Sequence, residues 1–373
     1  MLTAAPVVMA KPMAAVVLIG VSLSVAACGG STDARPLSTD GGGAGGPDGA
    51  AATGAQPCGS NAPAAGPVRL ASAKYPSAMA IDGANVYWVD SDLGTVNEVS
   101  VCGGPAMTLV DTSTLGPSTD LPAGVAVEGS AVYFTTQDPA NLDGNGGAVW
   151  KVPVGGGAPT MLLHGLDSPG PIAVSGGTLY WIEGWNTHAG DGSVMRAPTD
   201  GSTRVSLASA QNGPLSLAVG DGRVVWTTSG YVDSQHGSVW ETPMDGGLVD
   251  GVGAPQGMPV SVAVAGTRVF WADLGDPNVD NTGRVMEAPL DLAAAEPITL
   301  VSGGAPRAIA ADGAYAYWAD TQTVNKIPVA GGAKATVAAD QIGTVSMAVD
   351  ATTLYWTTFS IGTRQGSVMK IAK

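Results

Sequence analysis

The sequence predicts an all-β fold in which seven four-stranded antiparallel sheets form a ring, and three observations lead to it. First, a small alanine is followed eight residues later by a large aromatic residue in seven places: Ala80/Trp88, Ala126/Phe134, Ala173/Trp181, Ala218/Trp226, Ala263/Trp271, Ala310/Trp318 and Ala348/Trp356. Neighbouring pairs are 46, 47, 45, 45, 47 and 38 residues apart, which indicates an array of similar units. Second, each unit contains short apolar segments of strand length. Third, the two ends of the array complement each other. Together these observations predict a seven-bladed β-propeller.

The third unit illustrates the strands. Its apolar segments read "PIAV", "TLYWIE", "SVMRAP" and "RVSLA", and the connections "SGG" and "TDG" are short enough for tight hairpins. Four antiparallel strands of this kind make one propeller blade. Small residues in the first strand suit the crowded centre of the ring, and the aromatic residue in the second strand suits the wider space between blades.

The ends of the array predict how the ring closes. The seventh unit stops after its third strand, "GSVMKIAK", whereas "PVRLAS" at 67–72 precedes the first unit and matches "PITLVS" at 297–302. The N-terminal strand can therefore complete the last blade and cover two exposed sheet edges. We accordingly expect the propeller to span residues 67–373.

The second strands carry a recognisable motif, with the wording "YWVD", "YWIE", "FWAD", "YWAD" and "YWTT". This motif resembles the YWTD repeat of low-density-lipoprotein-receptor-type β-propellers, and the resemblance covers all seven units. It implies the fold and says little about function, since propellers serve many functions. The chain departs from the motif at Thr136, Thr228 and Thr358, which replace the acidic residue, and at Glu183, which extends it. That family usually has six blades, whereas seven repeats are counted here.

Residues 1–27 have the layout of a secretory signal peptide. An apolar run from 13 to 27 ends in "VAAC", Lys11 precedes it, and no acidic residue lies upstream of Cys28. The ending resembles the lipobox of bacterial lipoproteins, which implies lipidation of Cys28 and an exported protein anchored in the bacterial cell envelope, in the inner or the outer membrane. A retained membrane helix is the alternative, but it would need about 20 apolar residues. Residues 28–66 are rich in Gly, Ala and Pro and predict a flexible tether.

Cysteine content and charge narrow the classes of partner. Lipidation would consume Cys28 and leave Cys58 and Cys102, for which an exported context favours a disulfide over two free thiols. The formal net charge is −15, a field that repels nucleic acid and anionic membrane surfaces. We therefore expect the membrane to be contacted only through the lipid anchor.

The long connections between second and third strands should open on one face of the ring, and variable loops on a rigid scaffold are where binding sites concentrate. Their aromatic, carboxylate and amide groups suit a carbohydrate or peptide ligand, although Asn, Asp and Gly also serve simply as turn residues. The candidate ligand-binding residues are Asp138, Asp143, Trp185, His188, Asp191, Tyr231, Asp233, His236, Asp276, Asp280, Phe359 and Arg364.

The sequence lacks the usual marks of an enzyme: a serine elbow, a Cys/His pairing, or a glycine-rich loop followed by a helix. His188 with Asp191 and His236 with Asp233 could act as acid–base pairs, but polar loop contacts are the preferred interpretation. The leading hypothesis is a non-catalytic scaffold that binds a protein or other ligand and needs no cofactor. The alternatives are a metal-assisted propeller enzyme of the lyase or lactonase type at the central channel mouth, and a purely structural envelope component. Calcium in "NLDGNGG" or "GDPNVDN" is a further alternative, since carboxylate and amide oxygens are its ligands.

Overall fold

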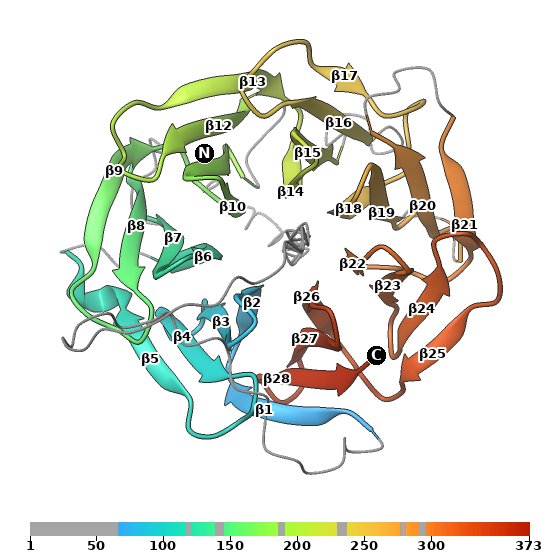
Figure 1. Ribbon diagram of the computed structural model, residues 1–373, viewed down its shortest axis with the longest axis horizontal. Coiled ribbons are helices and arrows are strands. Elements are labelled where there is room, and N and C mark those ends of the chain that lie inside the picture. Colours follow the sequence, from blue (N-terminus) through green and yellow to red (C-terminus); the bar gives the residue numbers. More distant parts are fainter. Residues whose placement is uncertain are drawn as a thin grey trace, which may run out of the picture.

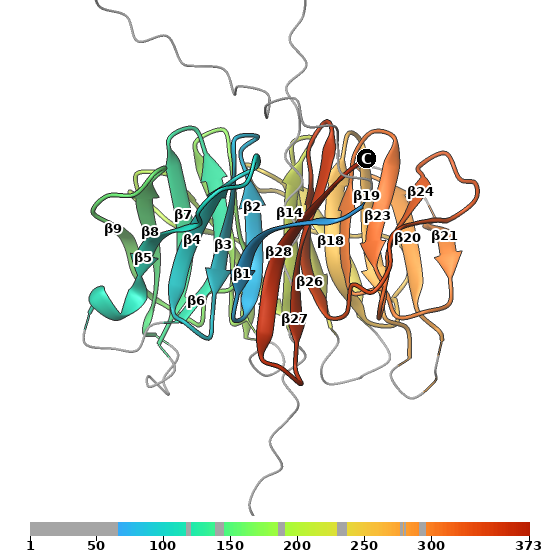
Figure 2. The ribbon, with the colours of Figure 1, turned by 90° about the horizontal axis from the view of Figure 1, so that it is seen from below.

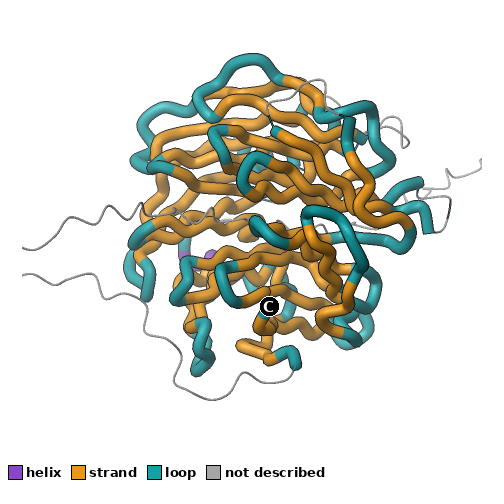
Figure 3. Tube along the Cα trace, turned by 45° about the vertical axis from the view of Figure 1, so that its right-hand side comes forward, coloured by secondary structure: helices purple, strands orange, loops and turns teal. Residues whose placement is uncertain are grey.

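The computed structural model describes residues 66–116, 121–138, 145–185, 191–229, 237–276, 279, 281–290 and 296–373. These residues form seven four-stranded antiparallel sheets, which are arranged as blades around a central axis (Figure 1). The predicted seven-bladed propeller is therefore confirmed. The one helix in these ranges is the short 3-10 helix η1 (Thr112–Thr114), and Figure 3 shows that strands joined by loops and turns make up the rest.

The blades are numbered here in chain order, and each is given from its innermost to its outermost strand. Blade 1 comprises β2 (Pro76–Ile81), β3 (Asn85–Asp90), β4 (Thr95–Ser100) and β5 (Met107–Asp111). Blade 2 comprises β6 (Leu121–Glu128), β7 (Ala131–Gln137), β8 (Gly147–Pro153) and β9 (Thr160–Leu166). Blade 3 comprises β10 (Ile172–Ser175), β11 (Thr178–Glu183), β12 (Gly192–Pro198) and β13 (Val205–Gln211). Blade 4 comprises β14 (Pro214–Gly220), β15 (Arg223–Thr228), β16 (Ser238–Pro243) and β17 (Asp250–Gly251). Blade 5 comprises β18 (Pro259–Ala265), β19 (Arg268–Asp273), β20 (Arg284–Pro289) and β21 (Ile298–Ser302). Blade 6 comprises β22 (Ala308–Ala311), β23 (Tyr315–Ala319), β24 (Val324–Pro328) and β25 (Ala335–Ala338). Blade 7 comprises β26 (Thr344–Val349), β27 (Thr353–Ser360), β28 (Gln365–Ala372) and β1 (Val68–Ala73).

Strand β1 closes the ring, as the sequence predicted. It lies antiparallel to β28 as the outermost strand of blade 7, with Val68 opposite Lys370 and Ala73 opposite Gly366. Figure 1 shows this strand outside β28, with the C-terminal strand between it and the centre of the ring. The closure covers the outer edge of β28, which would otherwise present unpaired backbone groups to solvent.

The repeated alanine and aromatic residues explain how adjacent blades pack. Within blade 7, Met347 lies opposite Trp356 and Ala348 lies opposite Tyr355, so the tryptophan and the alanine face opposite sides of the sheet. Trp356 belongs to one buried cluster with Ala310 and Tyr317 of blade 6. Small alanines therefore leave room for the indole of the following blade, at interior packing density. All seven repeated aromatic side chains are at most 2% exposed.

The two faces of the ring differ in which connections they carry. We call the hairpin face the one formed by the turns between first and second and between third and fourth strands, and the loop face the one formed by the other connections. Figure 2 places the end of β28 near one face and the turn after β27 at the opposite face. Within the described residues, no helix is long and apolar enough to cross a membrane.

The departures from the YWTD motif have a local structural reason. The carboxylate of Asp90 accepts hydrogen bonds from the backbone N–H groups of Lys74 and Tyr75, at 2.6 and 3.0 Å, and so holds the segment that leads into β2. At the corresponding position of blade 2, the Thr136 hydroxyl instead accepts a hydrogen bond from Trp150 Nε1, at 3.1 Å. Blade 4 repeats this arrangement with Thr228 and Trp240, at 3.2 Å. In blades 2 and 4 the threonine that replaces the acidic residue thus accompanies a tryptophan on the third strand, whereas the third strand of blade 7, which follows Thr358, contains no tryptophan.

Candidate functional site

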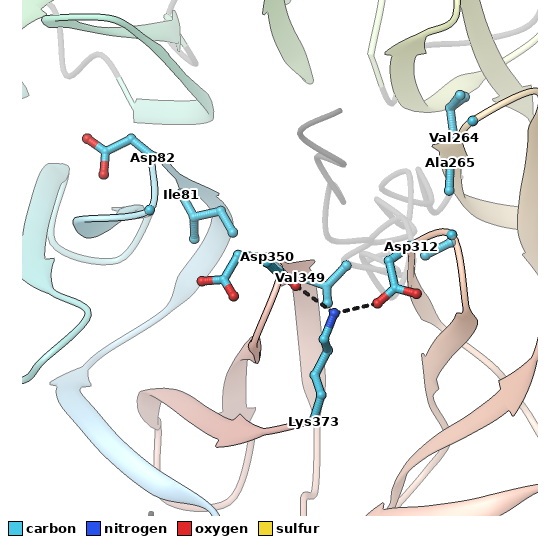
Figure 4. Close-up of a pocket in the computed structure, with 13 residues that line it drawn as sticks. Ile81, Asp82, Val264, Ala265, Asp312, Val349, Asp350 and Lys373 are labelled. Carbon is cyan, nitrogen blue, oxygen red and sulfur yellow. Dashed lines mark hydrogen bonds and ion pairs between the residues drawn. The ribbon is translucent and has the colours of Figure 1, made fainter. Parts of the chain in front are cut away.

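A cavity of about 440 Å³ opens at the mouth of the central channel on the hairpin face. Its walls come from the first hairpin turns of blades 1, 5, 6 and 7, which Figure 4 shows converging around one space. The lining residues are Ile81, Asp82, Gly83, Val264, Ala265, Gly266, Ala311, Asp312, Gly313, Val349, Asp350, Ala351 and Lys373. The volume lies in the range of small-molecule sites, and most of the side chains around it are apolar.

Three of these turns are built around an aspartate in the same way. In blade 6, Asp312 Oδ1 accepts hydrogen bonds from the backbone N–H groups of Ala314 and Tyr315, at 2.7 and 2.8 Å. Its Oδ2 accepts a hydrogen bond from the Tyr317 hydroxyl, at 3.3 Å. Asp82 and Asp350 repeat this pattern in blades 1 and 7. Each carboxylate therefore fixes its own turn, as Asx turns do.

Other blades turn differently at this position. In blade 3, Ser175 pairs with Thr178 around Gly176 and Gly177, which both have positive φ, at 58° and 74°. Two-residue hairpin turns with positive φ at both central positions favour glycine, and no side chain of the turn itself holds this one. The aspartate turns therefore occupy one arc of the channel mouth, formed by blades 6, 7 and 1, which the ring closure makes consecutive.

Lys373 joins two of the aspartate turns. Its Nζ donates hydrogen bonds to Asp312 Oδ2, at 2.6 Å, and to the backbone oxygen of Asp350, at 2.7 Å, as Figure 4 shows. Burial acts to raise the pKa of Asp312, but the hydrogen bond from Lys373 and those from the Tyr315 and Ala314 N–H groups outweigh it, so this pKa is lowered. In the turn of blade 7, burial and the charge of Asp350 raise the pKa of Tyr355, which remains a hydrogen-bond donor.

The described residues include half of the predicted ligand-binding residues, and these six lie on the other face. Asp143, His188, Tyr231, Asp233, His236 and Asp280 lie outside the described residues. The same holds for Cys28 and Cys58; Cys102 is disulfide-bonded, and its pairing with Cys58 stays a prediction. The six described positions all lie in or beside connections between second and third strands, in blades 2, 3, 5 and 7. They are distributed around the ring.

The two described aromatic candidates pack against the protein itself. Trp185 is half-buried, stacks over Gly170, where a Cβ atom would collide with the indole, and donates a hydrogen bond from Nε1 to the Leu215 backbone oxygen at 3.2 Å. Phe359 makes an edge-on contact with Tyr75, with ring centroids 4.5 Å apart. Both rings are therefore held in place by contacts within the protein.

The four polar candidates differ in exposure. Asp191 and Arg364 are exposed, whereas Asp138 and Asp276 are half-buried. Arg364 has a φ of 52°, in the left-handed region, at the turn between β27 and β28. The N–H of Asp276 donates to Thr282 Oγ1 at 2.9 Å, so this residue has a role in shaping its own loop.

The loop face carries exposed apolar side chains that the sequence analysis missed. Leu93, Leu121, Ile342 and Ile361 are 56%, 39%, 59% and 85% exposed. All four lie in the loops of blade 1, blade 7 and the segments that lead into blades 2 and 7. We refer to these four residues as the apolar strip.

Hydrogen bonds and one ring contact join residues that lie close in sequence to the members of the apolar strip. The N–H of Phe359 donates to the Gly343 oxygen at 2.9 Å, beside Ile342. Phe359 in turn contacts Tyr75, whose backbone oxygen accepts a hydrogen bond from the N–H of Ser91 at 3.0 Å, two residues before Leu93. The Ser91 hydroxyl donates to the Pro122 oxygen at 3.1 Å, next to Leu121. The segments that carry the strip residues are therefore joined to one another across three adjacent blades.

The described part of the chain contains no group of three or more His, Cys, Asp or Glu side chains that could hold a metal ion. The loops proposed for calcium lie partly outside the described residues, which lack 141–144, 277, 278 and 280. A calcium site there stays a prediction.

Comparison with known proteins supports the fold. No family model matches the sequence, and no curated protein does. The structure is similar to the hydrazine synthase of Kuenenia stuttgartiensis, with 16% sequence identity, a TM-score of 0.61, and coverage of 79% of this chain and 95% of that chain. It is also similar to the WD40 β-propeller domain of Doa1, with 12% identity, a TM-score of 0.58, and coverage of 82% and 97%. These identities show a shared propeller fold and nothing further.

A chain from a nidogen–laminin complex is similar at 18% identity, with a TM-score of 0.49 and coverage of 68% of this chain and 93% of that chain. This likeness is too limited to extend the YWTD resemblance beyond the sequence motif. The blade architecture is therefore established by the structure, and the YWTD relationship stays a prediction.

Proposed function

We propose that this protein is a non-catalytic binding propeller that docks a partner protein on its loop face, and that it is exported and lipid-anchored to the bacterial cell envelope through Cys28. The observation that supports the proposal is the apolar strip. Leu93, Leu121, Ile342 and Ile361 expose large apolar side chains on one side of one face. Exposed large apolar side chains on neighbouring loops of one face are a feature of interaction sites.

A protein partner suits this surface better than a carbohydrate. Both described aromatic candidates, Trp185 and Phe359, pack against the protein's own residues, so they do not offer flat rings for sugar stacking. The exposed side chains are instead aliphatic and are spread over three adjacent blades. Aliphatic side chains on a rigid, broad surface match the apolar centre of a protein–protein interface.

The direction of β1 supports a membrane-distal loop face. Because Val68 pairs with Lys370 and Ala73 pairs with Gly366, β1 begins near the hairpin face and runs toward the loop face. A tether that joins β1 to a lipid on Cys28 would thus approach from the hairpin face. With about 38 Gly-rich residues, such a tether would reach roughly 35 Å, which leaves the loop face free to meet a partner.

The docking proposal is tested by charge substitutions on the strip. The double variant Leu93→Asp/Ile361→Asp should reduce partner capture in photo-crosslinking from position 342 in intact cells at least tenfold, because each carboxylate would be buried unpaired in the interface. The matched control is Leu248→Asp/Ile298→Asp, which alters two residues on the outer rim that are 73% and 53% exposed.

Retention of the crosslinked partner by the control and its loss from the strip variant would support the proposal. Equal capture by both variants, or equal loss, would refute docking on the strip. The anchor is tested separately by Cys28→Ser. This variant should appear in the soluble exported fraction without the mass of a lipid group, and a membrane-bound Cys28→Ser protein would contradict the lipidation proposal.

A further inference from the structure

The cavity on the hairpin face contains one ammonium-binding site that is occupied by the protein's own Lys373 side chain; we call a pair of acceptors of this kind a seat. Lys373 Nζ lies between the Asp312 carboxylate of blade 6 and the Asp350 backbone oxygen of blade 7, at 2.6 and 2.7 Å. The Asp312 Oδ2 atom accepts from both Lys373 and Tyr317, which is within the capacity of a carboxylate oxygen. This seat shows how the aspartate turns receive a charged amino group.

The next pair of blades repeats the seat without its lysine. The N–H of Lys373 donates to the Thr352 oxygen, two residues after Asp350, and the N–H of Val101 donates to the Ala84 oxygen, two residues after Asp82. Val101 therefore occupies in blade 1 the position that Lys373 occupies in blade 7. By this equivalence, the Asp350 carboxylate and the Asp82 backbone oxygen correspond to the two acceptors that hold Lys373.

The second seat lies within the same cavity and carries uncompensated negative charge. Asp82 and Asp350 both line the cavity, and Asp350 Oδ2 accepts a hydrogen bond from the neutral Tyr355 hydroxyl at 2.9 Å. The nearest lysine of blade 7 on that side, Lys370, donates instead to the Val101 backbone oxygen at 2.6 Å. Within the described residues, no cationic side chain contacts either carboxylate.

We propose that this second seat binds the ammonium group of a small primary amine whose apolar part occupies the cavity. The two recognition elements are the seat formed by Asp350 and Asp82 and the apolar walls supplied by residues such as Ile81 and Val349. Lys373 gives the precedent, because it already places an alkyl-ammonium group on the equivalent acceptors. The site lies on the opposite face from the apolar strip, so it is independent of partner docking.

The test uses the full-length protein and n-butylammonium as the probe, with n-butanol as the neutral analogue, and isothermal titration calorimetry as the measurement. The wild-type protein should bind n-butylammonium saturably and at least about tenfold more tightly than n-butanol, because only the ammonium group can form a charge-assisted hydrogen bond with the carboxylate. Val101→Lys should supply the missing ammonium group internally and weaken the binding about tenfold or more.

The chain offers a matched control for the added charge. Val329 holds the equivalent position in blade 6, where its N–H donates to the Ala314 oxygen, but the neighbouring turn of blade 5 has Ala265 in place of an aspartate. Val329→Lys should therefore leave n-butylammonium binding within about threefold of wild type, because it adds the same charge without filling the seat. Asp350→Asn, which keeps an oxygen acceptor for the turn, should weaken binding as Val101→Lys does.

Four results would overturn the proposal: no saturable binding by the wild-type protein, equal binding of n-butanol, equal losses in the Val101→Lys and Val329→Lys variants, or unchanged binding in Asp350→Asn. Tighter binding of a blocked lysine amide than of n-butylammonium would assign the seat to a lysine side chain of another protein and would also overturn the proposal of a small amine.

Discussion

Two core tryptophans offer a sharp test of how hydrogen bonding supports the blades. Trp356 and Trp271 are both fully buried, and each lies on the second strand of its blade. Trp356 Nε1 donates to Gln341 Oε1 at 2.9 Å, whereas Trp271 Nε1 is buried without a partner in the described structure. Replacement by phenylalanine removes the same atoms at both sites, so the loss of apolar contact is matched.

The two replacements should differ in free energy of unfolding. Trp356→Phe leaves the acceptor of Gln341 unsatisfied in a residue that is 9% exposed, and an orphaned buried polar group costs about 1–3 kcal/mol. Trp271→Phe removes an N–H group that has no partner to lose. We therefore expect Trp356→Phe to be more destabilising than Trp271→Phe by about 1–3 kcal/mol.

The measurement is equilibrium unfolding in urea followed by circular dichroism, which avoids the change in tryptophan fluorescence. Equal losses at the two positions, or a larger loss for Trp271→Phe, would show that the hydrogen bond to Gln341 does not stabilise the blade. The double variant Trp356→Phe/Gln341→Leu supplies a further check, since removing both partners should recover part of the loss.

Three other predictions concern closure, backbone and charge. Deleting residues 66–73 would expose the outer edge of β28, so light scattering after size exclusion should show self-association in place of monomer; a fully monomeric deletion protein would argue against the role of β1. Gly343 has a φ of 69°, and a Cβ atom there would collide with the Phe359 backbone oxygen, so Gly343→Ala should lower the melting temperature. Gly362→Ala is the control, because a Cβ atom at Gly362 would meet no other atom nearby, and it should leave the melting temperature unchanged. The hydrogen bond from Lys373 helps to lower the pKa of Asp312 below its ordinary value of 3.8. The ionised Asp312 therefore stabilises the fold above pH 3.8, and this stabilisation is lost as the pH falls through the lowered pKa. Lys373→Ala should accordingly lose less melting temperature than the wild-type protein between pH 6 and pH 3, and an unchanged pH profile would contradict this assignment.

The fold was predictable because its determinants repeat. A fixed spacing of alanine and aromatic residues reports the packing of one blade on the next, and that requirement is the same at every interface of the ring. The closure by β1 was predictable for a related reason, since a missing fourth strand at one end and an extra strand at the other must be reconciled. Local sequence sufficed for both conclusions.

The site was less predictable because it depends on differences between copies. Asp312 and Tyr317 stand five residues apart, and so do Glu128 and Tyr133 in blade 2. The longer side chain of Glu128, however, reaches across to the N–H groups of Gly176 and Gly177 of blade 3, at 2.8 and 2.9 Å. One additional methylene thus converts a turn-holding carboxylate into a contact between blades, which spacing alone does not reveal.

The packing of the predicted aromatic ligand-binding residues against the protein was unpredictable for a similar reason. Trp185 follows a second strand and has the sequence context of an exposed loop residue, but Gly170 on a neighbouring segment leaves room for its indole to fold back. Conversely, Ile361 lies in a short turn where an aliphatic residue suggests a strand end, and it is the most exposed large apolar side chain among the described residues. Both outcomes depend on contacts between segments distant in sequence.

The differences between copies concentrate where the ring closes. The aspartate turns occupy blades 6, 7 and 1 on the hairpin face, and the apolar strip spans blade 7, blade 1 and the start of blade 2 on the loop face. Blades 7 and 1 are common to both, and β1 joins them to whatever precedes residue 66. In a ring of near-identical units, a surface can be selected for binding only where the repeat is broken. The chain breaks its repeat on both faces beside the same closing strand, so the proposed amine site and the proposed docking surface lie on opposite faces of the same blades, next to the strand to which the proposed tether is joined.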